Sequence, residues 1–122
     1  MSDKSVAERL QVKKGRRLAV LHAPKAMDAA VGAKDSRAAP EQAEVVLLFV
    51  ADRVSFEREL PKLLKRLRPE AILWLAYPKL SSKLAGDLSR DVIHRAAPAY
   101  DLDTVAQIAI DEDWSALRLK RI

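Results

Sequence analysis

Four side chains that could bind a ligand follow two apolar runs of the sequence. His22 and Lys25 come just after the first run, and Tyr77 and Lys79 come at the end of a later one. In an open α/β sheet, ligands bind beyond the carboxyl ends of the strands. If these residues converge there, the two lysines and the amides of a helix starting at Pro24 could bind a small anion. His22 could then exchange a proton as an acid–base group.

Each candidate also has a structural interpretation, which we favour. A histidine at a strand end is more often a hydrogen-bonded structural residue, and Lys79 can simply face solvent. Trp114 is a fifth candidate for ligand binding and could stack on a base, but in a strand it is more often part of the core. The acidic residues 111–113 could coordinate a hard cation, yet consecutive carboxylates point in different directions. We therefore assign no catalytic residue and no metal site.

A basic cluster lies before the first predicted strand, at Lys13, Lys14, Arg16 and Arg17. Residues 1–25 hold seven lysines and arginines against two carboxylates, a balance equal to the net charge of +5 of the chain. The cluster could bind phosphates, but it has no interleaved aromatic residues and matches no groove-reading motif. Nucleic-acid binding through this segment is therefore the weaker alternative, and a solvated surface is favoured.

The composition predicts one domain over residues 1–122, because 49% hydrophobic residues in 122 are enough to form a core. The chain has no cysteine, which excludes a disulfide framework and thiol catalysis. Two histidines alone make a zinc site improbable. Neither a membrane-spanning run of about 20 apolar residues nor a signal peptide is recognisable. We expect a cytoplasmic protein that does not contact membranes.

The centre of the predicted fold is a strand–helix–strand unit. Residues 45–50 and 71–76 are continuous apolar runs, typical of strands that are covered on both faces. Apolar residues at helical spacing predict a helix between them, with Ser55 as N-cap and a kink or break at Pro61. A unit of this length indicates parallel strands joined by a right-handed crossover.

The remaining elements are shorter. Caps, periodicity and turn residues predict a helix at 5–10, a strand at 17–22, a helix from Pro24 to Gly32, a helix after Ser89, and a hairpin of strands 104–110 and 114–122. Residues 33–43 show neither the hydrophobic period of a helix nor that of a strand. They are predicted to form a connection, with room for one short edge strand.

In this order the elements resemble the Rossmann-like methyltransferase fold with its second and third strands mostly deleted. Residues 44–50 look like the fourth strand of that fold, and residues 67–74 look like the L-x-P-G-G-x-L approach to its fifth. The resemblance implies a three-layer α/β protein with a mixed sheet of about five strands that ends in an antiparallel hairpin.

A narrower resemblance is to a family of small bacterial proteins known as domain of unknown function number three thousand and fifty-two, and to its relatives. Residues 10–15, 18–24, 45–50, 73–79 and 111–118 carry this resemblance by their order and spacing. It implies a fold and no established activity.

A working methyltransferase needs a glycine-rich turn after its first strand and an acidic residue at the end of its second. Here the turn is residues 22–25, which contain no glycine, and Asp35 is a poor substitute for the acid. We therefore predict no cofactor, and a binding or interaction module whose ligand is a protein or a small anion. The alternative is a small enzyme, an atypical transferase, that uses the strand-end crevice.

Deleting two strands has a predicted effect on helix placement. Right-handed crossovers would put all crossover helices on one face, leaving the central strands bare on the other. Either the helix at 5–10 covers that face within the chain, or a second copy covers it in a homodimer.

Overall fold

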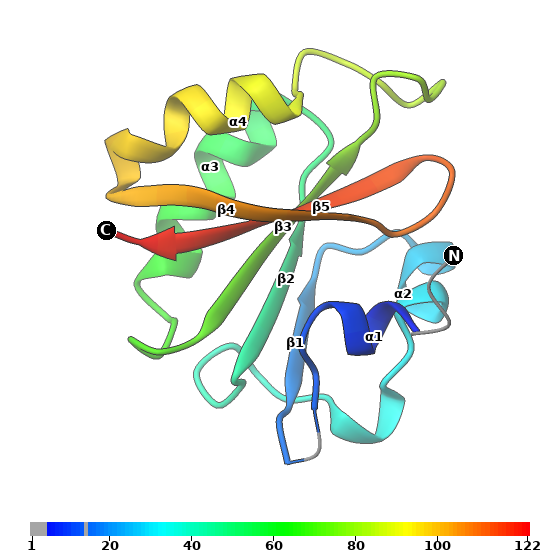
Figure 1. The fold of residues 1–122 in the computed structure, drawn as a ribbon, viewed down its shortest axis with the longest axis vertical. Coiled ribbons are helices and arrows are strands. Elements are labelled where there is room, and N and C mark those ends of the chain that lie inside the picture. Colours follow the sequence, from blue (N-terminus) through cyan, green and yellow to red (C-terminus); the bar gives the residue numbers. More distant parts are fainter. Residues whose placement is uncertain (1–4, 14) are drawn as a thin grey trace.

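In the computed structural model, the described residues 5–13 and 15–122 form a five-stranded sheet in the order β1-β2-β3-β5-β4 (Figure 1). The parallel part contains β1 (Leu18–Leu21), β2 (Val45–Phe49) and β3 (Ile72–Pro78). The hairpin strands are β4 (Leu102–Ala109) and β5 (Trp114–Arg121), and β5 lies antiparallel between β3 and β4. The predicted mixed sheet with a closing hairpin is confirmed.

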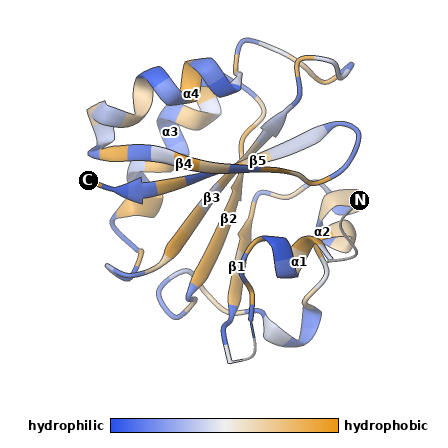
Figure 2. Cartoon of the chain, viewed as in Figure 1, coloured by the Kyte–Doolittle hydropathy of each residue, from blue (hydrophilic) through white to orange (hydrophobic). Residues whose placement is uncertain are grey.

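The central strands are apolar because both of their faces are covered. All five residues of β2 are buried, and alternate residues join two separate clusters of the core. Val46 and Leu48 belong to one cluster, and Val45, Leu47 and Phe49 belong to the other. Figure 2 shows the result as hydrophobic strands β1, β2 and β3 at the centre of the molecule, beside helices of mixed hydropathy. Continuous apolar runs of this kind are what a parallel sheet with two covered faces requires.

The helix between β2 and β3 begins earlier than the sequence suggests. α3 (Arg53–Leu64) has Asp52 as its N-cap, not Ser55: Asp52 Oδ1 accepts a hydrogen bond from the Ser55 amide at 2.8 Å, and Ser55 Oγ accepts one from the Asp52 amide at 3.2 Å. This reciprocal capping box satisfies two amides at once. The helix continues through Pro61 as one element.

After β3, Ser89 caps α4 (Arg90–Ala96) as predicted, and the short 3-10 helix η2 (Ala97–Tyr100) follows. No helix among the described residues is both long and apolar enough to span a bilayer.

The helices lie on both faces of the sheet. α1 (Val6–Arg9) and α2 (Lys25–Val31) pack on one face, and α3 and α4 pack on the other (Figure 1). The prediction that the crossover helices share one face is therefore wrong for α2. The reason is that the chain passes around the outer edge of β1 between α2 and β2, through the 3-10 turn η1 (Lys34–Ser36) and a single parallel bridge between Leu18 and Arg37.

Charged contacts hold this edge passage in place. Asp28 of α2 accepts hydrogen bonds from Lys34 Nζ at 2.9 Å and from Arg37 Nη1 at 2.8 Å. These donors lower the pKa of the Asp28 carboxyl from its ordinary 3.8 to about 2. Arg37 also donates to the carbonyl of Gly32, which ends α2 with a φ of 73°. The edge strand that had room in residues 33–43 is thus reduced to the one bridge at Arg37.

The N-terminal helix covers part of the second face within the chain. Its capping box between Ser5 and Glu8 is present as predicted, and Leu10, just after it, is fully buried. The indole Nε1 of Trp74, on β3, donates a hydrogen bond of 2.9 Å to the Leu10 carbonyl. α1 is therefore attached to the middle of the sheet, and the homodimer, as the other way to cover this face, stays a prediction.

Replacing Trp74 by phenylalanine should detach this helix. The Leu10 carbonyl would lose its buried donor, at a cost of about 1–3 kcal/mol in the free energy of unfolding. Urea denaturation would measure that cost, and faster hydrogen exchange at residues 7–12 would show the detachment. Trp114→Phe is the matched control, because the structure gives the Trp114 indole no hydrogen bond among the described residues. Equal exchange rates in the two variants would contradict the role of the Trp74 bond.

Candidate functional site

The parallel strands end together at one edge of the sheet, and the candidate residues follow them. His22, which follows β1, has a left-handed backbone with a φ of 59°. Its Nε2 atom lies 3.1 Å from Glu59 Oε1 of α3, and its ring lines a hollow of about 90 Å³ together with Lys62 and Arg66. The pKa of Glu59 is lowered, chiefly by the hydrogen bond from Arg58. His22 therefore contacts the α3 face rather than a cavity at the middle of the strand ends.

Lys25 and the Trp114 ring lie on the opposite face of the sheet from Tyr77. Lys25 is the exposed first residue of α2, on the face opposite α3. Trp114 is only 6% exposed and packs edge-on against Phe49, with ring centroids 5.2 Å apart. Its ring belongs to the core under α1 and α2, which leaves no face for stacking on a base.

Tyr77 and Lys79 do come together. They line an open crevice of about 410 Å³, which we call the Tyr77 crevice, with five other residues from the loop after β3, the start of α4 and the hairpin: Leu80, Ser81, Arg90, Gln107 and Ser115. The sequence analysis missed Arg90 and Gln107. Ser115 is placed here by its register opposite Tyr77, which is known only once β5 is known to lie next to β3.

Two nearly buried hydroxyls form the floor of this crevice. The Tyr77 side chain is 3% exposed and Ser115 is 4% exposed. The Tyr77 hydroxyl accepts a hydrogen bond of 3.0 Å from Gln107 Nε2, and Ser115 lies opposite Tyr77 in the register of β3 and β5. Burial raises the pKa of Tyr77 above its ordinary 10.0, although the positive charge of Arg90 opposes the shift. Tyr77 therefore stays a neutral hydrogen-bonding group and is unsuited to act as a base near neutral pH.

The walls of the crevice are basic. Lys79 is half-buried, and its amide donates to the Asp113 carbonyl at 2.8 Å, which fixes the loop against the hairpin turn. Arg90 lies at the start of α4 and makes a loose ion pair of 3.6 Å with Asp91. Two cations and two hydroxyls line this one crevice, an arrangement that can bind a small anion.

The acidic residues 111–113 are occupied in building the turn. Asp111 Oδ1 accepts from the amides of Asp113 and Trp114, at 2.8 and 2.7 Å. Asp113 Oδ1 accepts from Ser82 Oγ at 2.7 Å. These bonds fit the structural interpretation of the triplet as a solvated turn.

The basic cluster lies at the other end of β1. Arg16 Nη1 donates to the Gln11 carbonyl at 3.0 Å, and Arg17 Nη2 donates to the Gln42 carbonyl at 2.9 Å. Both guanidinium groups therefore hold neighbouring loops together. Lys13 lies among the described residues, and Lys14 lies outside them.

The turn after β1 does not fit the nucleoside of a methyl donor. Pro24, which has no amide hydrogen, is the N-cap of α2, and no glycine lets a ligand approach the turn 22–25. Asp35 lies in η1, next to the bridge at Leu18, which is the first residue of β1. It is thus at the opposite end of the strand from the edge where an acid would bind ribose hydroxyls.

Solved structures with similar folds include a methylase, a methyltransferase and a complex with SAM. The first is a ribosomal protein L11 methylase from Lactobacillus delbrueckii subsp. bulgaricus, with a TM-score of 0.59 and 16% identity over 95% of this chain and 74% of that one. The chain has a methyltransferase-like Rossmann fold.

The mitomycin 7-O-methyltransferase MmcR has a TM-score of 0.52 and 10% identity over 96% of this chain and 53% of that one. LepI, in a complex with SAM, has a TM-score of 0.54 and 9% identity over 96% of this chain and 39% of that one. At these identities the likeness concerns the fold alone. The sequence matches no family model and no curated protein, so the narrower resemblance stays a prediction.

The raised pKa of Tyr77 predicts how stability responds to alkaline pH. A raised pKa means that the folded state favours the neutral phenol, so its contribution is complete below pH 10.0 and is lost as the pH rises further. Tyr77→Phe should therefore lose less stability than the wild type between neutral pH and about pH 11, as measured by urea denaturation. Tyr100→Phe is the control, because Tyr100 is half-buried and lies outside the crevice. Its ring packs against Phe56, with ring centroids 5.8 Å apart. An identical alkaline loss in wild type and Tyr77→Phe would contradict the expectation.

Proposed function

We propose that this protein is a binding module built on a methyltransferase-like fold, that it does not use a methyl donor, and that its Tyr77 crevice binds a small anion. The observation that carries the proposal is the state of the strand-end edge. Lys79 and Arg90 lie beside the end of β3, while the turn after β1 lacks glycine and Asp35 lies in η1, near the start of β1 rather than its end. The part of the edge that would hold a nucleoside is lost, and the basic part is kept.

Binding is favoured over catalysis because the possible acid–base groups are separated. His22 lines the hollow against Glu59, and Tyr77 lines a different cavity. A small transferase would need a proton-accepting group within hydrogen-bond reach of its reacting atom, and Tyr77 is held neutral. We also propose a cytoplasmic location, in line with a chain that contains no cysteine.

Calorimetry with S-adenosylmethionine and S-adenosylhomocysteine tests the first half of the proposal. LepI has a related fold and its structure is a complex with SAM, so the fold by itself permits such binding. Here we expect no saturable heat from either compound, because the turn 22–25 offers neither glycine nor a Pro24 amide. Saturable binding of either compound at micromolar concentration would overturn this part.

Titration with inorganic phosphate tests the second half. Amide shifts in an NMR spectrum should concentrate at residues 79–81, 90 and 115. Replacing both Lys79 and Arg90 by alanine should weaken phosphate binding by about tenfold or more, because charge-assisted hydrogen bonds are the strong ones.

Arg95→Ala is the matched control for this titration. Arg95 lies on the same helix as Arg90 and is exposed, but it lines a different cavity between α3 and α4. Equal weakening by Arg95→Ala, or shifts that lie outside the crevice, would show that phosphate responds to overall charge only and would contradict the site.

A further inference from the structure

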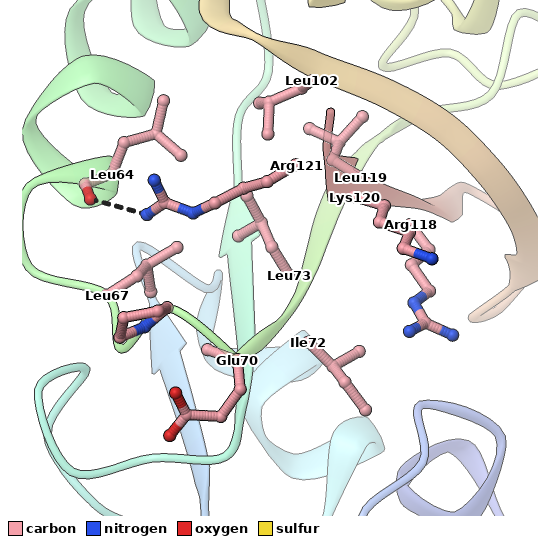
Figure 3. A pocket seen from close by; sticks show the side chains of 12 residues that line it. Leu64, Leu67, Glu70, Ile72, Leu73, Leu102, Arg118, Leu119, Lys120 and Arg121 are labelled. Carbon is pink, nitrogen blue, oxygen red and sulfur yellow. Dashed lines mark hydrogen bonds between the residues drawn. The ribbon is translucent and has the colours of Figure 1, made fainter.

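The sheet forks at the end opposite the Tyr77 crevice. The last residue pair between β3 and β5 is Leu73 with Leu119. Beyond it, Ile72 continues to pair with β2, while Lys120 and Arg121 continue to pair with β4. β3 and β5 therefore separate here, and a cavity of about 190 Å³ opens between them (Figure 3). We call it the fork cavity.

Five of the twelve residues that line the fork cavity are leucines. They come from the end of α3, the segment after it and three strands: Leu64, Leu67, Leu73, Leu102 and Leu119. Its volume lies below the roughly 300–1,000 Å³ of sites for drug-sized ligands. An apolar cavity of this size suits a small ligand with an aliphatic or aromatic body, since burying that body removes apolar surface from water.

Arg121 lines this cavity, and most N–H donors of its guanidinium make no hydrogen bond among the described residues. Its Nη2 atom donates to the Leu64 carbonyl at 3.1 Å, the one acceptor that it has among the described residues. Figure 3 shows the guanidinium extending between Leu64 and Leu73 towards that carbonyl. A guanidinium carries five N–H donors in a planar fork, which matches the two oxygens of a carboxylate.

The remaining charges on the lining also favour an anion. Arg118 and Lys120 line the cavity, and neither has an ion-pair partner among the described residues, although the register places Asp103 opposite Lys120. Glu70 is the one acidic residue on the lining, and its carboxylate is already 3.2 Å from Arg68. Arg118 and Lys120 point to the opposite face of β5 from Arg121 (Figure 3), so Arg121 is the cation beside the leucines, and the one acid of the lining is already paired.

We propose that the fork cavity binds a small amphipathic carboxylate, whose apolar body lies among the leucines and whose carboxylate pairs with the Arg121 guanidinium. This site lies at the other end of the sheet from the Tyr77 crevice. It goes beyond the proposed function and does not depend on it.

Octanoate is the probe that tests this proposal, with 1-octanol and acetate as its matched partners. Calorimetry should show saturable octanoate binding with one site per chain, and amide shifts should concentrate at residues 71–73 and 118–121. Both partners should bind about tenfold or more weakly, because 1-octanol lacks the charge and acetate lacks the apolar body. No saturable octanoate binding, equal binding of 1-octanol, or shifts elsewhere would overturn the proposal.

Arg121→Gln should weaken octanoate binding by about tenfold or more. Arg9→Gln is the matched control, because Arg9 Nη2 also donates to a backbone carbonyl, that of Ala109 at 2.6 Å, and lies outside the fork cavity. Equal weakening by the two variants would overturn the assignment of Arg121.

A second variant decides the matter if Arg121→Gln does not fold. Ala71 lines the cavity, is half-buried and precedes β3, so Ala71→Phe places a ring at the fork without cutting a strand. It should abolish octanoate binding. Retained octanoate affinity in a folded Ala71→Phe protein would overturn the proposal.

Discussion

A parallel strand pair that is apolar on both sides must be covered on both sides, and this constraint shapes the whole chain. With β1 joined directly to β2, a crossover of the usual hand would place α2 on the same face as α3. The chain instead passes around the outer edge of β1, and the contacts of Asp28 with Lys34 and Arg37 hold that passage in place. α2 thereby stays on the second face with α1, and the Trp74 bond to Leu10 attaches the N-terminal helix over the centre of the sheet.

The missing outer strands also explain why the two halves of the strand-end edge differ. The outer strands of a full Rossmann sheet would flank β1, and here a single bridge at Arg37 stands in their place among the described residues. In the half of the edge beside β1, the turn 22–25 contains no glycine, and Asp35 lies near the other end of the strand. The half beside β3 is built by α4 and the hairpin, which are both intact, and the basic crevice forms there. The methyltransferase-like sheet is thus combined with a strand-end edge whose two halves differ.

Much of the fold follows from sequence, because local patterns report burial directly. The runs at β2 and β3, the Ser5 and Ser89 caps and the closing hairpin are all predictable from periodicity and capping chemistry. Asp52 displaced Ser55 as the cap of α3 because both residues can accept an amide, and only the path of the chain after β2 decides between them. The face of α2 and the neighbours of Tyr77 depend on contacts distant in sequence, so no local pattern reveals them. Ser115 and Gln107, for example, reach Tyr77 only through the register of β5 against β3 and β4.

The position of β5 also sets the order in which the molecule can assemble. β5 follows β4 along the chain but lies between β4 and β3. When β4 leaves the ribosome it has no neighbouring strand to pair with, and the sheet is complete only after β5 has paired with both β4 and β3. Folding must therefore wait for contacts between distant residues, which are slow to form. Until β5 pairs with β3, the edge of β3 that β5 covers in the folded protein stays exposed. The nascent chain is most prone to aggregate at this stage.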